Sequence, residues 1–122
     1  MEQNGKKKFQ TYKDLNVWQK ALNLAATVFR ATEDFHDGDP AGLSNRIRES
    51  SMLIPSSIAE GHGRRGEFKH YLQAAMASSC TLETQLSLAC KLELMAGIRM
   101  NEILKELEDV RRMMGGLIKK VD

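Results

Sequence analysis

The longest periodic segment of this chain is residues 66–95, with the sequence GEFKHYLQAAMASSCTLETQLSLACKLELM. Apolar and small side chains recur in it at alternating intervals of four and three residues: Phe68, Leu72, Ala75, Ser79, Leu82, Leu86 and Ala89. This heptad-like spacing places them on one face of a helix and is typical of helices that pack lengthwise against one another. The segment therefore predicts a long helix inside an all-α protein.

Three further segments have the same helical periodicity. We expect helices over residues 14–32, 42–60 and 100–120, because apolar side chains recur in each at intervals of three and four. Glycine, proline and aspartate gather in the short stretches between the helices and are typical of turns. Four helices with short connections predict an up-down-up-down four-helix bundle. Its 122 residues fit a single domain, 1–122, with a basic N-terminal arm over residues 1–13.

Two details of the helices carry specific expectations. Pro55 lies inside the second helix, where it removes a backbone hydrogen bond and clashes with the carbonyl of Ser51. Because the glycines that end the helix come later, at 61–63, we expect a kink at Pro55 and not a helix end. The first helix has two adjacent apolar stripes, one through Val17 and one through Trp18. This face is wider than one bundle seam needs, so we expect part of it to contact another subunit.

Composition limits the class of protein. With 42% hydrophobic residues, 28% charged residues and a net charge of +2, the chain is neither disordered nor uniformly basic like a histone. The N-terminal residues are polar, and no run approaches the ~18 apolar residues that a membrane span needs. Cys80 and Cys90 would lie ~15 Å apart along one helix, too far for a disulfide. We therefore expect a cytoplasmic protein with reduced thiols and no membrane segment.

No motif in the chain indicates catalysis. Glu67 and His70 form a Glu-x-x-His pair, but a di-iron bundle needs two such pairs, and the chain has no second one. The glycine-rich stretch 61–66 follows a predicted helix and lacks the Lys-Ser/Thr of a phosphate-binding loop, which favours a helix–helix turn. We expect no enzymatic activity, no cofactor and no metal. A metal-dependent enzyme built on Glu67 and His70 remains the weakest alternative.

Charge is distributed unevenly along the predicted bundle. One end collects residues 1–14, 60–70 and 111–122, with a net charge of +6, and is called the basic pole here. The other end collects residues 30–42 and 91–102, with a net charge of −3, and is called the acidic pole. Clustered cations suit phosphate backbones, which predicts a nucleic-acid-binding surface. Its candidate residues are Lys6, Lys7, Lys8, Arg64, Arg65, Lys69, Arg111, Arg112, Lys119 and Lys120. The alternative is that these cations only keep the protein in solution.

Three stretches resemble a known family. The first is Leu-x-Val-Trp at residues 15–18, and the second is Ile-Pro-Ser-Ser-Ile-Ala-Glu-Gly at residues 54–61, followed by Gly63-Arg64. The third is the pattern of the third predicted helix, from Glu67-Phe68 to Leu88-Ala89. They resemble the four-helix bundle proteins encoded in bacterial 23S rRNA intervening sequences. The chain departs from the family pattern at Ser57, where Asn is common, and at Ser78, where Gly is common. The signature residues are Trp18, Ile54, Pro55, Ile58, Ala59, Glu60 and Gly61.

The resemblance implies a closed four-helix bundle, a ring-shaped homopentamer and no enzymatic activity. A related branch, the accessory proteins of diversity-generating retroelements, binds nucleic acid and a reverse transcriptase through basic surfaces, so both are partners by analogy. The leading hypothesis is a non-enzymatic oligomeric bundle that contacts RNA or DNA through the basic pole. The alternative is a protein-binding scaffold with no nucleic-acid role.

Overall fold

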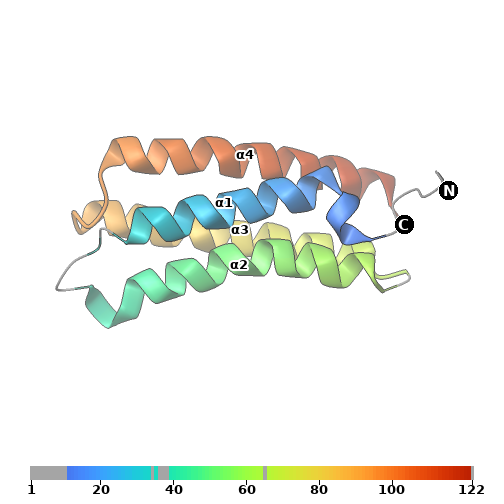
Figure 1. Ribbon diagram of the computed structural model, residues 1–122, viewed down its shortest axis with the longest axis horizontal. Coiled ribbons are helices and arrows are strands. Elements are labelled where there is room, and N and C mark those ends of the chain that lie inside the picture. The colour runs from blue at the N-terminus through green and yellow to red at the C-terminus, as the bar shows by residue number, and fades with distance from the viewer. Residues whose placement is uncertain (1–10, 34, 36–38, 65, 122) are drawn as a thin grey trace, which may run out of the picture.

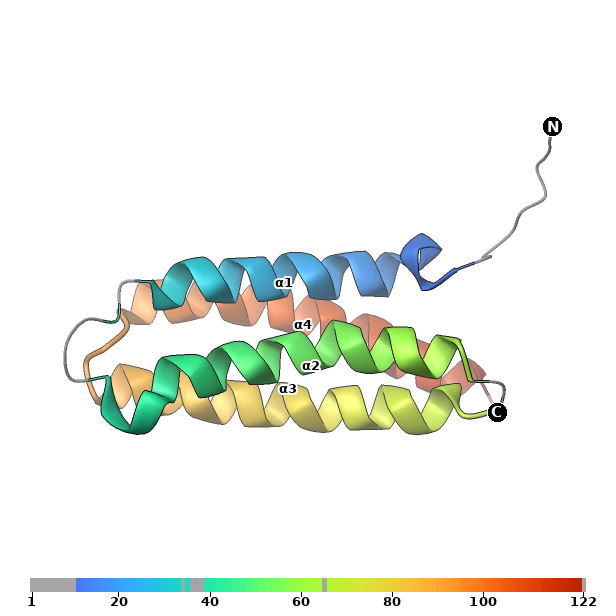
Figure 2. The ribbon, with the colours of Figure 1, turned by 60° about the horizontal axis from the view of Figure 1, so that its bottom comes forward.

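The computed structural model describes residues 11–33, 35, 39–64 and 66–121. Its four α-helices are α1 (Asn16–Thr32), α2 (Leu43–His62), α3 (Phe68–Lys91) and α4 (Gly97–Lys120). Short 3-10 turns, η1 (Tyr12–Asp14) and η2 (Pro40–Gly42), precede α1 and α2. Successive helices run in opposite directions, and α4 returns beside α1 (Figures 1 and 2). The predicted up-down-up-down bundle is confirmed.

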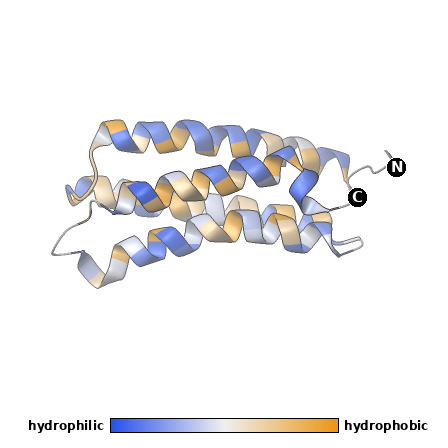
Figure 3. Ribbon diagram, viewed as in Figure 1, coloured by the Kyte–Doolittle hydropathy of each residue, from blue (hydrophilic) through white to orange (hydrophobic). Residues whose placement is uncertain are grey.

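The core forms where one face of each helix meets the others. Apolar and polar residues alternate along every helix, so each has an apolar side and a polar side (Figure 3). The predicted heptad positions of α3 supply Leu72, Ala75, Leu82 and Leu86, which are fully buried. Burying a side chain the size of leucine contributes about 1.5–3 kcal/mol relative to leaving it in water, so this seam accounts for much of the stability.

Helix α2 passes through Pro55 and continues to His62. Its axis bends near the middle, as the sequence predicts for a proline inside a helix (Figures 1 and 2). Pro55 is buried, and so are Ile54 and Ile58 on either side of it. These signature residues therefore hold α2 in the bundle.

Two predicted helix boundaries are wrong. Helix α3 ends at Lys91 and not at Met95, because Glu93 adopts a left-handed conformation with φ of 62°. The amide of Leu94 then donates to the carbonyl of Ala89 at 2.9 Å, which closes the helix end. Helix α4 begins at Gly97, three residues before the predicted start. None of the described helices is long and apolar enough to cross a membrane.

At Gly61, α2 lies very close to α3. A Cβ atom added to Gly61 would lie 2.4 Å from Cβ of Tyr71, a separation that real side chains do not adopt. Only a residue without a side chain therefore fits here. The last signature position of α2 thus fixes how tightly the α2–α3 turn closes at the basic pole.

Candidate nucleic-acid interface

The topology gathers four chain segments at one end of the bundle. The start of α1, the end of α2, the start of α3 and the end of α4 all lie at the right-hand end of Figure 1. These segments carry the described cations of the basic pole whose side chains are exposed: Lys13, Arg64, Lys69, Arg112, Lys119 and Lys120. Asp14, Glu60 and Glu67 are the carboxylates in the same segments. Lys6, Lys7, Lys8 and Arg65 lie outside the described residues.

Arg111 differs from the other predicted contact residues. It lies opposite Ser79 in the middle of α3, and only 19% of its side chain is exposed. Its guanidinium forms ion pairs with Glu83 at 2.8 Å and Glu108 at 3.1 Å, and donates to the Ser79 hydroxyl at 3.0 Å. Burial by itself would lower the pKa of Arg111, but its hydrogen bond to Glu83 and the charges of Glu83 and Glu108 raise it above the ordinary value. Arg111 therefore holds α4 against α3, and its N–H groups are already bonded to Glu83, Glu108 and Ser79.

Arg112, the next residue, points to solvent and keeps 69% of its side chain exposed. It pairs with Asp109 one turn earlier on the same helix. An exposed pair of this kind contributes little to stability and exchanges easily with other partners. Of the two adjacent arginines, Arg112 is thus the one available to a ligand.

Planar side chains cluster with the cations at the α2–α3 turn. The guanidinium of Arg64 lies over the ring of Tyr71, 5.5 Å from its centroid. The ring of His70 meets Tyr71 edge-on at 5.4 Å, and His62 meets Phe68 in the same way at 5.8 Å. The charge pattern of this stretch did not predict these ring contacts. The signal was present in Phe-Lys-His-Tyr at residues 68–71, where two aromatic residues flank two basic ones.

A second surface is the apolar groove between α1 and α2. It has a volume of about 300 Å³. It is lined by Tyr12, Trp18, Leu22, Ala25, Met52, Pro55, Ser56 and Ala59. Leu22 and Met52 are 46% and 44% exposed, and Leu53 beside them is 51% exposed. Three signature residues, Trp18, Pro55 and Ala59, therefore face a surface groove as well as the bundle. The wide apolar side predicted for the first helix lies here.

The other candidate groups from the sequence are the possible metal ligands and the two cysteines. Within the described residues, no group of three or more His, Cys, Asp or Glu side chains lies close enough to hold a metal ion. Glu67 and His70 are both exposed at the start of α3. Cys80 and Cys90 are free thiols, as predicted, and burial raises the pKa of Cys90. Cys90 lies 3.4 Å from the sulfur of Met100, which joins the end of α3 to the start of α4.

Comparison with protein families gives one finding. The family described as 23S rRNA-intervening sequence protein matches residues 13–116, which include all of α1, α2 and α3 and most of α4. A search of curated proteins found no match. The matched region contains the three stretches that carry the resemblance and the close α2–α3 contact at Gly61. With this match and the four-helix bundle, the chain belongs to the 23S rRNA-intervening sequence protein family.

Proposed function

We propose that this protein is a non-enzymatic, self-associating bundle that contacts RNA or DNA through its basic pole. The observation that carries the proposal is the common placement of Lys13, Arg64, Lys69 and the 119–120 lysine pair at one end, with exposed side chains. Cations that neutralise phosphates release counterions, and this release drives binding without any need for a base sequence. Lys119 and Lys120 also occupy the last turn of α4, where the helix dipole favours positive charge.

Self-association strengthens the electrostatic argument. A single chain presents only a few exposed cations, some of them near carboxylates such as Glu60 and Glu67. A ring of subunits in one orientation, as the family resemblance implies, would repeat these cations around a common rim. The α1–α2 groove supplies a reason for assembly, since covering exposed apolar surface contributes about 25 cal/mol per Å². The exposed side chains of Leu22 and Met52 would become buried in such a contact.

The groove also supports the alternative, a scaffold for a different protein. Its apolar lining fits a protein surface better than it fits nucleic acid. A reverse transcriptase is such a partner by family analogy. In that case substitutions in the groove would abolish the protein's role, whereas charge reversal at the basic pole would leave it intact.

Fluorescence anisotropy tests nucleic-acid binding. Labelled generic RNA and DNA are titrated with the full chain over a salt series, and the logarithm of the binding constant is expected to fall linearly with that of the salt concentration. Arg64→Glu with Lys69→Glu should weaken binding strongly. Lys91→Glu with Lys105→Glu makes the same charge change on exposed residues outside the basic pole and should weaken it much less. Absence of binding at low salt, or equal losses in the two double variants, would refute the proposal.

Analytical ultracentrifugation tests self-association. The native chain is expected to sediment as an oligomer, and Leu22→Gln with Met52→Gln should shift it toward monomer because the groove becomes polar. Lys20→Gln with Lys105→Gln changes exposed residues outside the groove and serves as the control. A native chain that stays monomeric at tens of micromolar would contradict this part of the proposal.

A further inference from the structure

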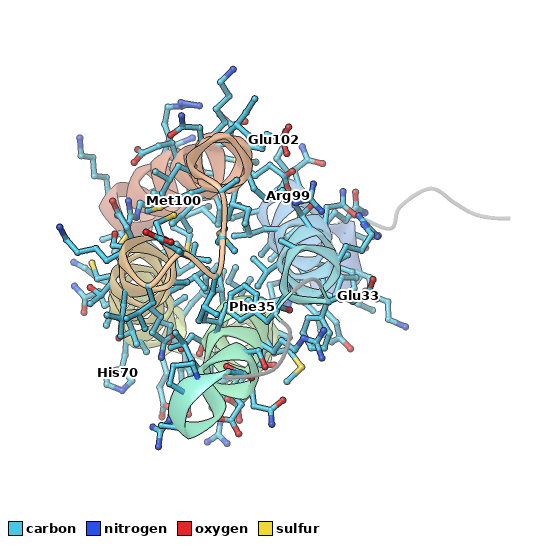
Figure 4. The ribbon with its side chains drawn as sticks, turned by 90° about the vertical axis from the view of Figure 1, so that its left-hand side faces the viewer. Glu33, Phe35, His70, Arg99, Met100 and Glu102 are labelled. Atoms are coloured by element: carbon cyan, nitrogen blue, oxygen red, sulfur yellow. The ribbon has the colours of Figure 1, made fainter. Side chains whose placement is uncertain are left out.

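The α2–α3 turn holds an ordered set of planar groups at the basic pole. Tyr71 is half-buried, and its Cβ is held against Gly61. The guanidinium carbon of Arg64 lies over the Tyr71 ring, and Arg64 remains exposed to solvent. His70 meets the same ring edge-on and points away from the bundle (Figure 4). The half-buried Tyr71 ring thus contacts two exposed planar groups.

Arg64 and Arg111, both assigned to the basic pole, make different kinds of contact. Arg111 has its donors occupied by carboxylates and by Ser79, as expected of a group that stabilises packing. Among the described residues, the Arg64 guanidinium contacts the face of the Tyr71 ring and forms no hydrogen bond or ion pair with another side chain. A guanidinium plane backed by an aromatic ring is suited to receive a further flat group on its outer side.

Unpaired bases are the flat groups that such a surface binds in a nucleic acid. Bases in single strands stack on aromatic rings and on arginine planes, with little dependence on sequence, because every base has a π face. In a duplex the bases are already paired and stacked, so these groups would reach only the backbone. Lys69, beside His70 in sequence and exposed, adds a charge for the adjoining phosphate.

We propose that the basic pole binds single-stranded nucleic acid, with one unpaired base stacked on Arg64 and a neighbouring base stacked on the exposed ring of His70. This inference rests on the proposed function and specifies which form of nucleic acid the pole takes. The stacking proposal also makes a different prediction from a surface that binds nucleic acid by charge alone. A duplex has the higher charge density, so a surface that reads only charge would prefer a duplex of equal length.

The test compares single strands with a duplex on the full-length protein. The probes are labelled rU12, dT12 and a 12-base-pair dA·dT duplex at one salt concentration. Both single strands are expected to bind more tightly than the duplex. Arg64→Lys keeps the charge but removes the plane, and His70→Ala removes an exposed ring. Each should lower single-strand affinity roughly 5- to 100-fold, the loss of one stacked base, and leave duplex affinity within about twofold.

Lys69→Gln is the matched control for charge. It should weaken single strands and duplex alike and reduce the salt slope by about one. A duplex bound as tightly as the single strands, or Arg64→Lys and His70→Ala without effect on rU12 and dT12, would overturn the stacking inference while the basic pole remained a nucleic-acid surface. Failure of all three probes to bind at low salt would instead overturn the proposed function itself.

Discussion

Replacing Gly61 with alanine tests whether the close α2–α3 contact organises the basic pole. The new Cβ would lie 2.4 Å from Cβ and 3.1 Å from Cγ of Tyr71, and 3.2 Å from Cδ1 of Phe68. Carbon atoms pack best at about 3.5–4.0 Å, so α2 and α3 must separate by about 1 Å at this end. None of the three atoms is the free tip of a flexible chain, so the clash cannot be relieved by a simple side-chain rotation.

The magnitude follows from two opposing effects. Overpacking of this kind costs about 1–3 kcal/mol, whereas replacing glycine inside a helix gains about 0.5–1 kcal/mol. The net expectation for Gly61→Ala is a loss of up to about 2.5 kcal/mol in the free energy of unfolding. Gly116→Ala makes the same substitution inside α4, with no atom within 4 Å of the new Cβ, and should gain about 0.5–1 kcal/mol.

Urea unfolding at fixed protein concentration, followed by circular dichroism, measures both variants. The difference between them isolates the steric term, because the change in helix propensity is common to both. Fixed concentration matters because self-association would add to the apparent stability. If Gly61→Ala proved as stable as Gly116→Ala, the close contact would not constrain the turn, and the reasoning about Gly61 would be refuted.

Further predictions concern the arginines that join helices. Arg111→Met should lower the free energy of unfolding by about 1–2 kcal/mol, because it removes a half-buried ion pair with Glu83. Arg112→Met should change it by less than about 0.5 kcal/mol, because its ion pair is exposed. Equal effects of the two variants in urea unfolding would contradict this difference. Arg48→Met should cost about 1–2 kcal/mol, since the guanidinium donates to the Thr32 hydroxyl at 2.7 Å and holds the end of α1 on α2. Thermal unfolding within a degree or two of the native chain would count against that role.

The bundle was predictable from the sequence because its signals are repetitive. Six of the seven predicted heptad positions of α3 are buried and the seventh, Phe68, is partly buried. The late glycines correctly indicated that α2 continues past Pro55. The end of α3 was not predictable, because Glu93 takes a left-handed conformation that favours glycine. The pattern of apolar residues does not indicate this conformation at Glu93, because it depends on how the chain turns toward α4.

The candidate site was predictable in position and not in detail. Short connections were enough to place the cations of three segments at one end. Arg111 and Arg112 are adjacent and chemically identical, so nothing local distinguishes them. Their roles separate because one faces Ser79 and Glu83 on α3 and the other faces solvent. The contact of Arg64 with the Tyr71 ring likewise depends on the tight turn that Gly61 permits.

Photo-crosslinking tests the central claim, that nucleic acid contacts the basic pole, most directly. Single-stranded RNA containing 4-thiouridine is irradiated with the full-length protein at low salt, and the crosslinked peptides are identified by mass spectrometry. Crosslinks are expected within residues 60–71 and 112–121, at the end of α2, the start of α3 and the end of α4. Crosslinks confined to the acidic pole, residues 91–102, or to the α1–α2 groove would contradict this claim.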